Sequence, residues 1–581
     1  MQSSFGIGKT LKGFNLFRSK LFLVILFSLL ILLSFSPYLS AGFYADDAMN
    51  SQVTLVAKKQ NISVLEFTNK IIYNWQKDVG RYYPLGFLGS YTFYDLFPEE
   101  ASAHIIQMFL VLINMLLFSG VIYILTSSTS LALLFIPILL LHFQIRDFYD
   151  PIAGYAPFMQ LMFIYVVGEI VFFLRYLKNG SSKSLIGSCL LFLASLLTYE
   201  LAIVFLGIFI LLTWSQCKSI KKSLNHLKFH LLILFSYISY IIYLRANRTS
   251  SYSGTELTTN PSITIESYLH QLGAMLPLSY FSANKFITFE TIFSGEYDIL
   301  PAIGCCLITF VILLLFSSDK REKQKSFFNK DLIFICLGFV FLPPLVVAFS
   351  ARWQVSVSAG VGYIPVYFSY YGCAFFITFW IHKLFIGNSS KRFFYIAAIL
   401  FTLPLTSLIN HLSNQQSVET QNILWKHPRK QLQSAYKSQL FDSIHGATAV
   451  TPKSFSWNSE YLSEKSLSTF ASIISVSQFD NKIKESMKTT TIYFLDFRSS
   501  LTKRDLDQWV FLSPISYQKN ELLYFSNPKF FLNPLSNKHI KVVVSCNKHK
   551  EEITFNKEII NNVVSATPFN CTLDKLDIHL E

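Results

Sequence analysis

Two neighbouring carboxylates, Asp46 and Asp47, closely follow the first long apolar run of the sequence. Adjacent carboxylates repel each other, so one of them holds a proton more readily and is suited to accept one during a reaction. The pair would also suit a helix that starts at Ala48, because Asp is frequent at helix N-caps. The pair therefore predicts either a general base or a solvated helix cap, and on these two residues alone the cap is favoured.

An arginine among aromatic residues comes next. Trp75 and the run Gly80-Arg81-Tyr82-Tyr83-Pro84 precede the second apolar run. The guanidinium of Arg81 could hold a phosphate through two parallel hydrogen bonds, where a lysine would offer only a point charge. Arg, Tyr and Trp are also common anchors at a membrane surface, and for Arg81 alone that is the simpler interpretation.

Five further charged residues near apolar runs are secondary candidates. Arg146, Asp147 and Asp150 could line the same site or form a charged turn that ends in proline, and the turn is slightly favoured. Glu200 lies inside a long apolar stretch, where an acid marks a functional site unless it reaches water. Arg352 could bind a donor phosphate or anchor a helix end, with equal weight.

The elements that position these residues are those of a membrane protein. Of 581 residues, 52% are hydrophobic and 14% are charged, whereas about one-quarter of a soluble domain is charged. The net charge of +14 does not indicate nucleic acid, because the basic residues form short clusters between apolar runs. Membrane lipids are therefore expected partners, and nucleic acid is not.

Eleven apolar runs predict about eleven transmembrane helices. One stretch, Ser184–Trp214, is about 31 residues long with basic clusters at both ends, so we expect a hairpin that turns near Tyr199–Glu200. The runs are Leu21–Tyr38, His104–Thr126, Leu131–Phe143, Ala156–Leu174, Ser184–Tyr199, Leu201–Trp214, Phe229–Tyr243, Ile299–Phe316, Leu332–Phe349, Val361–Ile381 and Phe393–Ile409.

The basic clusters also predict the orientation. All of them fall on the cytoplasmic side if the amino terminus is cytoplasmic. The first run lacks a small-residue cleavage site, so we expect a retained helix rather than a signal peptide. With an odd number of helices, residues 411–581 then lie outside the cytoplasm.

Two domains are expected from this topology. Residues 1–410 form an all-α transmembrane domain with a long first extracytoplasmic loop at residues 41–103. Residues 411–581 form a soluble extracytoplasmic domain that is α/β or β-rich, because strand-like runs alternate there with Asn, Pro and Ser turns. These runs are Thr490–Leu495, Glu521–Phe525 and Ile540–Val544.

Cysteine and glycine patterns give no cofactor motif. The sequence contains no paired CxxC motifs, no Gly-rich phosphate loop and no HExxH, so no metal site is predicted. Of eight cysteines, only Cys546 and Cys571 lie in the carboxyl-terminal segment. They form a disulfide or stay as two free thiols, and an oxidising compartment would allow the first.

Together, a first apolar run that leads into Tyr-x-Asp-Asp, a long loop and the Trp…Gly-Arg-Tyr-Tyr-Pro element resemble the GT-C class of membrane glycosyltransferases. The resemblance is strongest to the bacterial glucosyltransferases that decorate the O-antigen of lipopolysaccharide. It covers the first hundred or so residues at motif level and the rest in topology. It implies an all-α GT-C-like fold in the bacterial inner membrane and a polyprenyl-phosphate-linked sugar as donor.

The resemblance also implies roles for the candidate residues. Asp46 would be the general base of an inverting displacement and Asp47 would orient or neutralise a neighbour, while Arg81, helped by Arg352, would bind the departing donor phosphate. The acceptor would be an envelope glycan or a lipid. The class has metal-dependent and metal-independent members, so the resemblance leaves a divalent cation open.

Two other functions are compatible with many transmembrane helices. A transporter or lipid flippase would more typically show internal repeats and acidic residues at the middle of the membrane. A glycan polymerase or ligase would not be expected to place an acidic pair directly after its first helix. The sequence therefore favours the glycosyltransferase.

Overall fold

A computed structural model describes residues 20–146, 149–252, 254, 256–258, 260–284, 289, 298–318, 329–386, 392–422 and 426, together with the strand residues given below. The chain divides into two compact units. The first comprises Met1–Ala41 and Val64–Val418, and the second comprises Gly42–Ser63 and Glu419–Glu581. Asp147 and Cys571 lie outside the described residues.

Most described residues of the first unit lie in helices. Seven of them are long and apolar enough to cross a membrane, which makes the chain a multi-pass membrane protein. These seven are α2 (Lys20–Ser40), α7 (Glu100–Thr126), α9 (Phe158–Asn179), α12 (Ile220–Ala246), α16 (Ile299–Ser318), α17 (Lys330–Ala348) and α20 (Arg392–Gln421).

The other helices of this unit are shorter or less apolar. Three are short apolar helices: α8 (Thr129–Leu140), α10 (Ser182–Thr198) and α11 (Ala202–Cys217). The remaining ones are α5 (Val64–Asn74), the π-helix η3 (Trp75–Val79), α6 (Pro84–Leu96), α13 (Pro261–Ala274), α14 (Ser279–Ala283), α18 (Ala351–Ser356) and α19 (Val366–Ile386).

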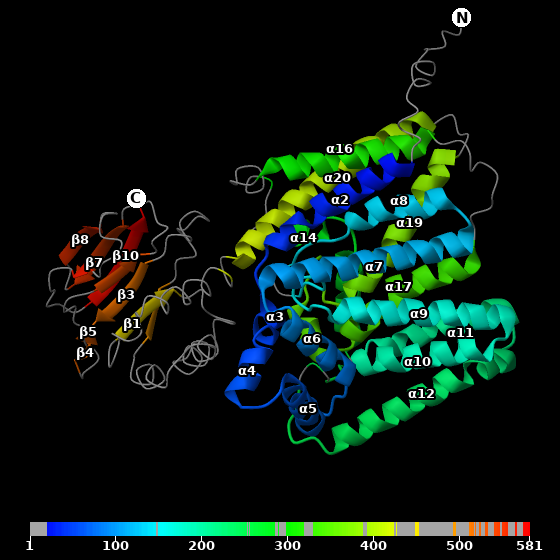
Figure 1. Cartoon of the computed structure of the whole chain (residues 1–581), viewed down its shortest axis with the longest axis horizontal. Helices are drawn as coiled ribbons and strands as arrows, with labels where there is room; N and C mark the ends of the chain where they lie inside the picture. Colours follow the sequence, from blue (N-terminus) through cyan, green and yellow to red (C-terminus); the bar gives the residue numbers. More distant parts are fainter. Residues whose placement is uncertain are drawn as a thin grey trace, which may run out of the picture. The chain divides into compact units, whose positions relative to one another are not determined.

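Each of the eleven apolar runs coincides with one helix of this unit, from α2 to α20. The expected hairpin is confirmed, because α10 ends at Thr198 and α11 begins at Ala202. Figure 1 shows the long helices running alongside one another, with α2 and α16 at one edge of the group and α10, α11 and α12 at the other. The count of eleven crossings stays a prediction, since seven helices meet the length and apolarity needed.

Polar side chains begin several of these helices. Ser128, Asn260 and Asn329 each accept a hydrogen bond from a backbone N–H in the first turn, before α8, α13 and α17 respectively. Such caps satisfy N–H groups that have no partner within the helix. At the other end of α9, Gly180 adopts φ +64°, which ends the helix in the left-handed region that glycine favours.

An aromatic cluster packs four helices together. The rings of Phe163 (α9) and Tyr371 (α19) lie 4.0 Å apart between centroids, and Phe118 (α7) stacks on Phe339 (α17) at 5.5 Å. The Nδ2 of Asn114 donates a hydrogen bond of 2.9 Å to the hydroxyl of Tyr367 inside the same cluster. Offset and edge-on ring contacts stabilise such a core beyond the buried area alone.

The outer faces of the helices are apolar. Large side chains are exposed along α2, α12, α16 and α20, for example Leu32, Phe235, Leu300 and Phe401. In water, faces of this kind would drive association, whereas in a bilayer they contact lipid tails. This distribution agrees with membrane lipids as partners.

The second unit begins with two short helices, α3 (Ala45–Asn50) and α4 (Val53–Lys59). Within this unit the backbone N–H of Gly42 donates to Asn422 Oδ1 at 2.9 Å, and a Cβ on Gly42 would lie only 2.6 Å from the Cβ of Lys426. Residues 42–63, expected in the transmembrane domain, therefore belong to the unit that contains the carboxyl terminus.

Strands follow in the carboxyl-terminal segment: β1 (Thr448–Pro452), β2 (Ile492–Leu495), β3 (Val510–Ile515), β4 (Tyr517–Gln518), β5 (Leu522–Leu523), β6 (Lys529–Leu532), β7 (Ile540–Cys546), β8 (His549–Phe555), β9 (Val564–Ser565) and β10 (Leu573–Leu580). Their orders are β2-β1-β3-β6-β9, β10-β7-β8 and β4-β5. The β1–β2 pair is parallel and the others are antiparallel. Most of residues 423–581 lie outside the described residues, so the separate carboxyl-terminal domain stays a prediction.

The expected boundary at residue 410 falls inside a helix. α20 continues to Gln421, and the first unit ends at Val418. The residues just past 410 are polar but buried, among them His411 and Asn414. A polar sequence therefore continues the helix here because it lies against other polar groups of the first unit.

A glycine sets the contact between α19 and α17. A Cβ on Gly372 would lie 2.6 Å from the carbonyl oxygen of Cys336 and 2.8 Å from Val340 Cγ2. Gly372→Ala should therefore lower stability by about 1–3 kcal/mol, seen as a lower melting temperature in detergent. Gly120→Ala is the matched control, because nothing lies within 4 Å of the position of its Cβ. Equal melting temperatures for both variants would contradict this packing.

Candidate functional site

Three of the charged residues singled out from the sequence meet at one cavity of the first unit. It encloses about 430 Å³ of empty space, part of it open to solvent. Arg81 and Glu200 line it, and Arg352 borders it by bonding to the lining residue Tyr252. The full lining is Arg81, Tyr199, Glu200, Leu201, Tyr252, Gly254, Val346, Val347, Ser350, Trp353, Tyr363 and Pro365.

The central contact is a two-point ion pair. Arg81 Nε donates to Glu200 Oε1 at 3.1 Å, and Arg81 Nη2 donates to Glu200 Oε2 at 2.8 Å. The side chains are 10% and 18% exposed, so the pair is largely removed from water. Paired hydrogen bonds of this type fix the plane of the guanidinium.

Glu200 leaves one edge of the guanidinium open. A guanidinium has five N–H groups, and the pair with Glu200 uses those on the edge from Nε to Nη2. Among the described residues, the hydrogen bonds of the Arg81 guanidinium are made by Nε and Nη2, both to Glu200. The edge formed by Nη1 and Nη2 can therefore bind the two oxygens of another anion while Glu200 stays in place.

Aromatic rings surround the guanidinium. Its Cζ lies 4.8 Å from the ring centroid of Tyr83, 5.6 Å from Tyr252, 5.8 Å from Trp75 and 5.9 Å from Tyr199. Rings at these distances attract a cation through their negative faces. They also exclude water, which strengthens electrostatic contacts to a bound ligand.

The turn that carries Arg81 is held by the segment after α12. Gly80 ends η3 with φ +71°, and a Cβ there would lie 2.9 Å from the Cα of Arg245, so this position requires glycine. The hydroxyls of Thr249 and Ser250 donate to Asp78 at 2.8 and 2.7 Å. These contacts bring the following residues, including Tyr252, to Arg81.

Arg352 adds a second cation from the short helix α18. Its Nη1 donates to the hydroxyl of Tyr252 at 3.0 Å, and its Cζ lies 4.9 Å from the ring of Trp353. No carboxylate lies within 4.0 Å of Arg352 in the described part of the chain. Two arginines and one glutamate therefore give the cavity one net positive charge, which suits an anionic ligand.

Arg146 is fully buried and is bonded on all sides. Its Nε and Nη2 donate to the hydroxyl of Tyr370 at 3.2 and 2.7 Å, Nη2 also donates to Ala274 O at 2.8 Å, and Nη1 donates to Gly360 O at 3.2 Å. Gly362 adopts φ +68°, and its Cβ position lies 2.9 Å from Arg146 Nη1. Arg146 therefore ties three segments together and is not among the cavity residues.

Asp150 is also buried and organises its own turn. Its Oδ2 accepts the N–H of Arg146 at 2.9 Å, and Oδ1 accepts those of Ile152 at 2.8 Å and Ala153 at 2.6 Å. This arrangement favours the charged turn over a ligand site for Arg146 and Asp150. Asp147, the third member of that group, is not among the described residues.

Asp46 and Asp47 belong to the second unit, in the first turn of α3. Asp47 is 1% exposed and Asp46 is half-buried. The helix begins at Ala45 instead of Ala48, so Asp47 is not the solvated cap considered from the sequence. Carboxylates in a first turn interact favourably with the positive end of a helix.

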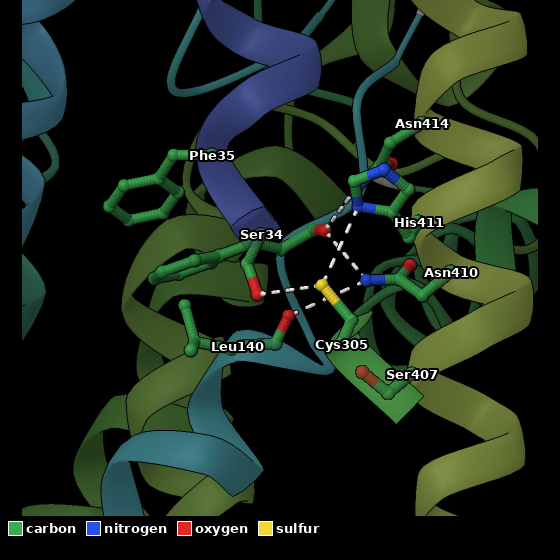
Figure 2. A pocket seen from close by; sticks show the side chains of 9 residues that line it. Ser34, Phe35, Leu140, Cys305, Ser407, Asn410, His411 and Asn414 are labelled. Atoms are coloured by element: carbon green, nitrogen blue, oxygen red, sulfur yellow. Dashed lines mark hydrogen bonds between the residues drawn. The ribbon is translucent and has the colours of Figure 1, made fainter. Parts of the chain in front are cut away.

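A second cavity, shown in Figure 2, lies in the first unit between α2, α16, α20 and the segment after α8. It has about 280 Å³ of empty space, part of it open to solvent, and its polar lining includes Ser34, Cys305, Asn410 and His411. The Sγ of Cys305 lies 3.7 Å from His411 Nδ1 and 3.8 Å from Ser34 Oγ. No Asp, Glu, Lys or Arg lines it, so the Arg81 cavity is the better candidate for an anionic ligand.

Among the described residues, no group of three or more His, Cys, Asp or Glu is close enough to hold a metal ion. No protein-family model matches the chain, and no curated protein matches it.

Two kinds of residue in the first unit were missed by sequence reasoning. Tyr252 and Tyr363 complete the cavity, but a tyrosine near an apolar run carries no distinctive signal. Glu169 is a fully buried acid near the middle of α9. The rule that an acid in an apolar run marks a site, used for Glu200, applies equally to Glu169 and would have identified it.

The Asp150 turn generates a prediction about pH. Burial raises the pKa of the Asp150 carboxyl from 3.8 to about 6, although three backbone N–H groups and nearby Arg146 act to lower it. A raised pKa means that the folded state binds the proton more tightly. The protonated Asp150 carboxyl therefore adds roughly 3 kcal/mol to the free energy of unfolding below about pH 4. This contribution is lost as the pH rises through about 6.

Asp150→Asn should lower the melting temperature in detergent, because the Asn amide N–H₂ cannot accept the N–H that Asp150 Oδ2 accepts. Since asparagine does not titrate, the gap between native protein and variant should be larger at pH 5 than at pH 8. A gap that is larger at pH 8 would mean that the carboxylate is favoured in the folded state, contrary to this prediction.

Proposed function

We propose that the protein is a membrane glycosyltransferase that transfers a sugar from a polyprenyl-phosphate donor to an envelope glycan or lipid acceptor. The observation that supports this most is that Glu200 binds only the Nε–Nη2 edge of Arg81, which leaves the Nη1–Nη2 edge of a cavity-lining guanidinium for a ligand. A cation fixed in this way is suited to a phosphate oxygen pair. The resemblance to the enzymes that decorate O-antigen supports the same substrate class.

In this proposal the donor phosphate binds Arg81, and Arg352 provides a second positive charge for it. Glu200 is a positioning residue, because it orients the guanidinium without touching the donor. The acceptor oxygen forms a bond to the anomeric carbon as the bond from that carbon to the phosphate oxygen breaks. The phosphate leaves with the electron pair, and the arginines stabilise the charge that develops on it.

The acceptor hydroxyl must lose a proton in this reaction. We assign Asp46 as the general base and Asp47 as a residue that orients or neutralises a neighbour. A single displacement inverts the anomeric centre. Phosphate is a good leaving group, so no acid catalyst is needed, whereas a base that takes the hydroxyl proton speeds the reaction.

The proposal includes a location and an orientation. The chain lies in the bacterial inner membrane with its amino terminus in the cytoplasm and residues 411–581 outside. The basic clusters between the helices support this orientation. The extracytoplasmic segment would contribute to the choice of acceptor.

A polytopic transporter or lipid flippase is the second candidate, and one observation favours it. Glu169 is 0% exposed and lies near the middle of α9, where ion-coupled transporters place acidic residues. Such a protein would move its substrate without consuming a sugar donor. An assay of donor consumption separates the two functions.

Membranes that contain the protein should consume radiolabelled polyprenyl-phosphate sugar, and Arg81→Lys should slow this by about tenfold or more. Lysine keeps the charge but cannot bond a phosphate and Glu200 at the same time through a rigid fork. Arg175→Lys is the matched control, because Arg175 is exposed at the end of α9. No donor consumption by the native protein would exclude the glycosyltransferase and leave the transporter.

Asp46→Asn tests the base separately. The variant keeps the shape of the side chain but removes the proton acceptor, so transfer should fall on the order of 100-fold at unchanged protein level. Donor binding, measured by protection of the protein against thermal unfolding, should not change. Equal and mild losses in Asp46→Asn and Asp47→Asn would remove the base assignment while leaving the donor site intact.

A further inference from the structure

Glu169 is placed where a carboxyl is hardest to keep ionised. It is the twelfth of the 22 residues of α9, so roughly 16 Å of helix lie on either side of it. It is 0% exposed, and its neighbours on the helix, including Val166, Ile170 and Phe173, are buried and apolar. A carboxylate in such surroundings is strongly disfavoured unless a positive group pairs with it.

The described part of the chain supplies no such positive group. The ion pairs Arg81–Glu200 and Glu266–His270 do not involve Glu169. Titratable groups on adjacent helices include Cys189 on α10 and His230 on α12. Helices α6, α7 and α11 also pack against α9, and in the described residues they direct no charged group at this carboxyl.

The imidazole of His230 contacts Ser188 and not the Glu169 carboxyl. Its Nε2 lies 3.0 Å from Ser188 Oγ, which lies 3.1 Å from the backbone oxygen of Glu169. A backbone oxygen only accepts, so the single hydroxyl hydrogen of Ser188 points to it, and Nε2–H of His230 donates to Ser188. The ring therefore contacts the backbone of α9 through Ser188 and does not neutralise the Glu169 carboxyl.

The hydrogen bonds of the Ser195 hydroxyl indicate whether the Glu169 carboxyl carries a proton. Its Oγ lies 2.8 Å from the carbonyl oxygen of Phe192 and 3.4 Å from Glu169 Oε2. The hydroxyl has one hydrogen, and the shorter contact to Phe192, one turn earlier in the helix, uses it. The contact between Ser195 and Glu169 is then a hydrogen bond only if the carboxyl carries the hydrogen.

We infer that Glu169 is a proton-binding site within the helix bundle, holding its carboxyl as the neutral acid that donates to Ser195 Oγ. The other oxygen, Oε1, has no hydrogen-bond partner among the described residues, which suits the carbonyl oxygen of an acid better than half of a carboxylate. Ser188 and Ser195 are seven residues apart on α10, so both face α9 from one side of the helix. The site does not depend on sugar transfer.

Infrared spectroscopy tests the site, because the carbonyl stretch of a protonated carboxyl is separate from the bands of carboxylates. The full-length protein is measured at pH 8 in an ester-free detergent, where exposed carboxyls are ionised. The native protein should show an acid band that shifts in D₂O. Glu169→Gln should lose this band, and the matched variant Glu266→Gln should retain it, since Glu266 is exposed.

Ser195→Ala gives a second readout that does not need Glu169→Gln to fold. Removing the acceptor should move the acid band to higher frequency without abolishing it. The proposal is overturned if the native protein has no acid band at pH 8, if Glu169→Gln keeps the whole band, or if Ser195→Ala leaves its frequency unchanged.

Discussion

Burying a guanidinium is costly unless its N–H groups are bonded, and this requirement organises the ends of the helices in the first unit. Arg81 is held by a carboxylate from the α10–α11 turn, by the ring of Tyr199 from the same turn and by the ring of Tyr252 from the segment after α12. Arg146 is held by groups from the end of α13, from Gly360 and from α19. Because the acceptors are far apart in the sequence, each arginine fixes how several helices end relative to one another.

The helices could largely be predicted from the sequence, because lipid requires long apolar runs and each run became a helix. The turn at Tyr199–Glu200 could be predicted as well, since basic clusters flank both ends of that stretch. The end of α20 could not. The polarity of residues such as Asn410 and Asn414 predicts a segment outside the membrane, yet they donate hydrogen bonds of 3.1 and 3.0 Å to the carbonyl oxygen of Phe143 inside the first unit.

The members of the candidate site could be found in the sequence more readily than their pairing. Arg81, Glu200 and Arg352 were conspicuous because a charge beside an apolar run is costly. That Glu200 binds Arg81 depends on a contact across 119 residues of sequence, which no local pattern specifies. Tyr252 depends in turn on how Thr249 and Ser250 bind to Asp78.

Arg81 and Arg146 show why a buried arginine is not by itself a ligand site. Neutral acceptors, namely two backbone carbonyls and a tyrosine hydroxyl, engage all three guanidinium nitrogens of Arg146, so no edge remains for a ligand. A single carboxylate engages Arg81 on one edge and lines the same cavity. A carboxylate supplies two acceptor atoms from one residue, so it fixes the guanidinium while occupying only half of it. Arg352 adds a second positive charge without a carboxylate of its own in the described part of the chain, so the cavity keeps an excess positive charge that suits an anionic ligand.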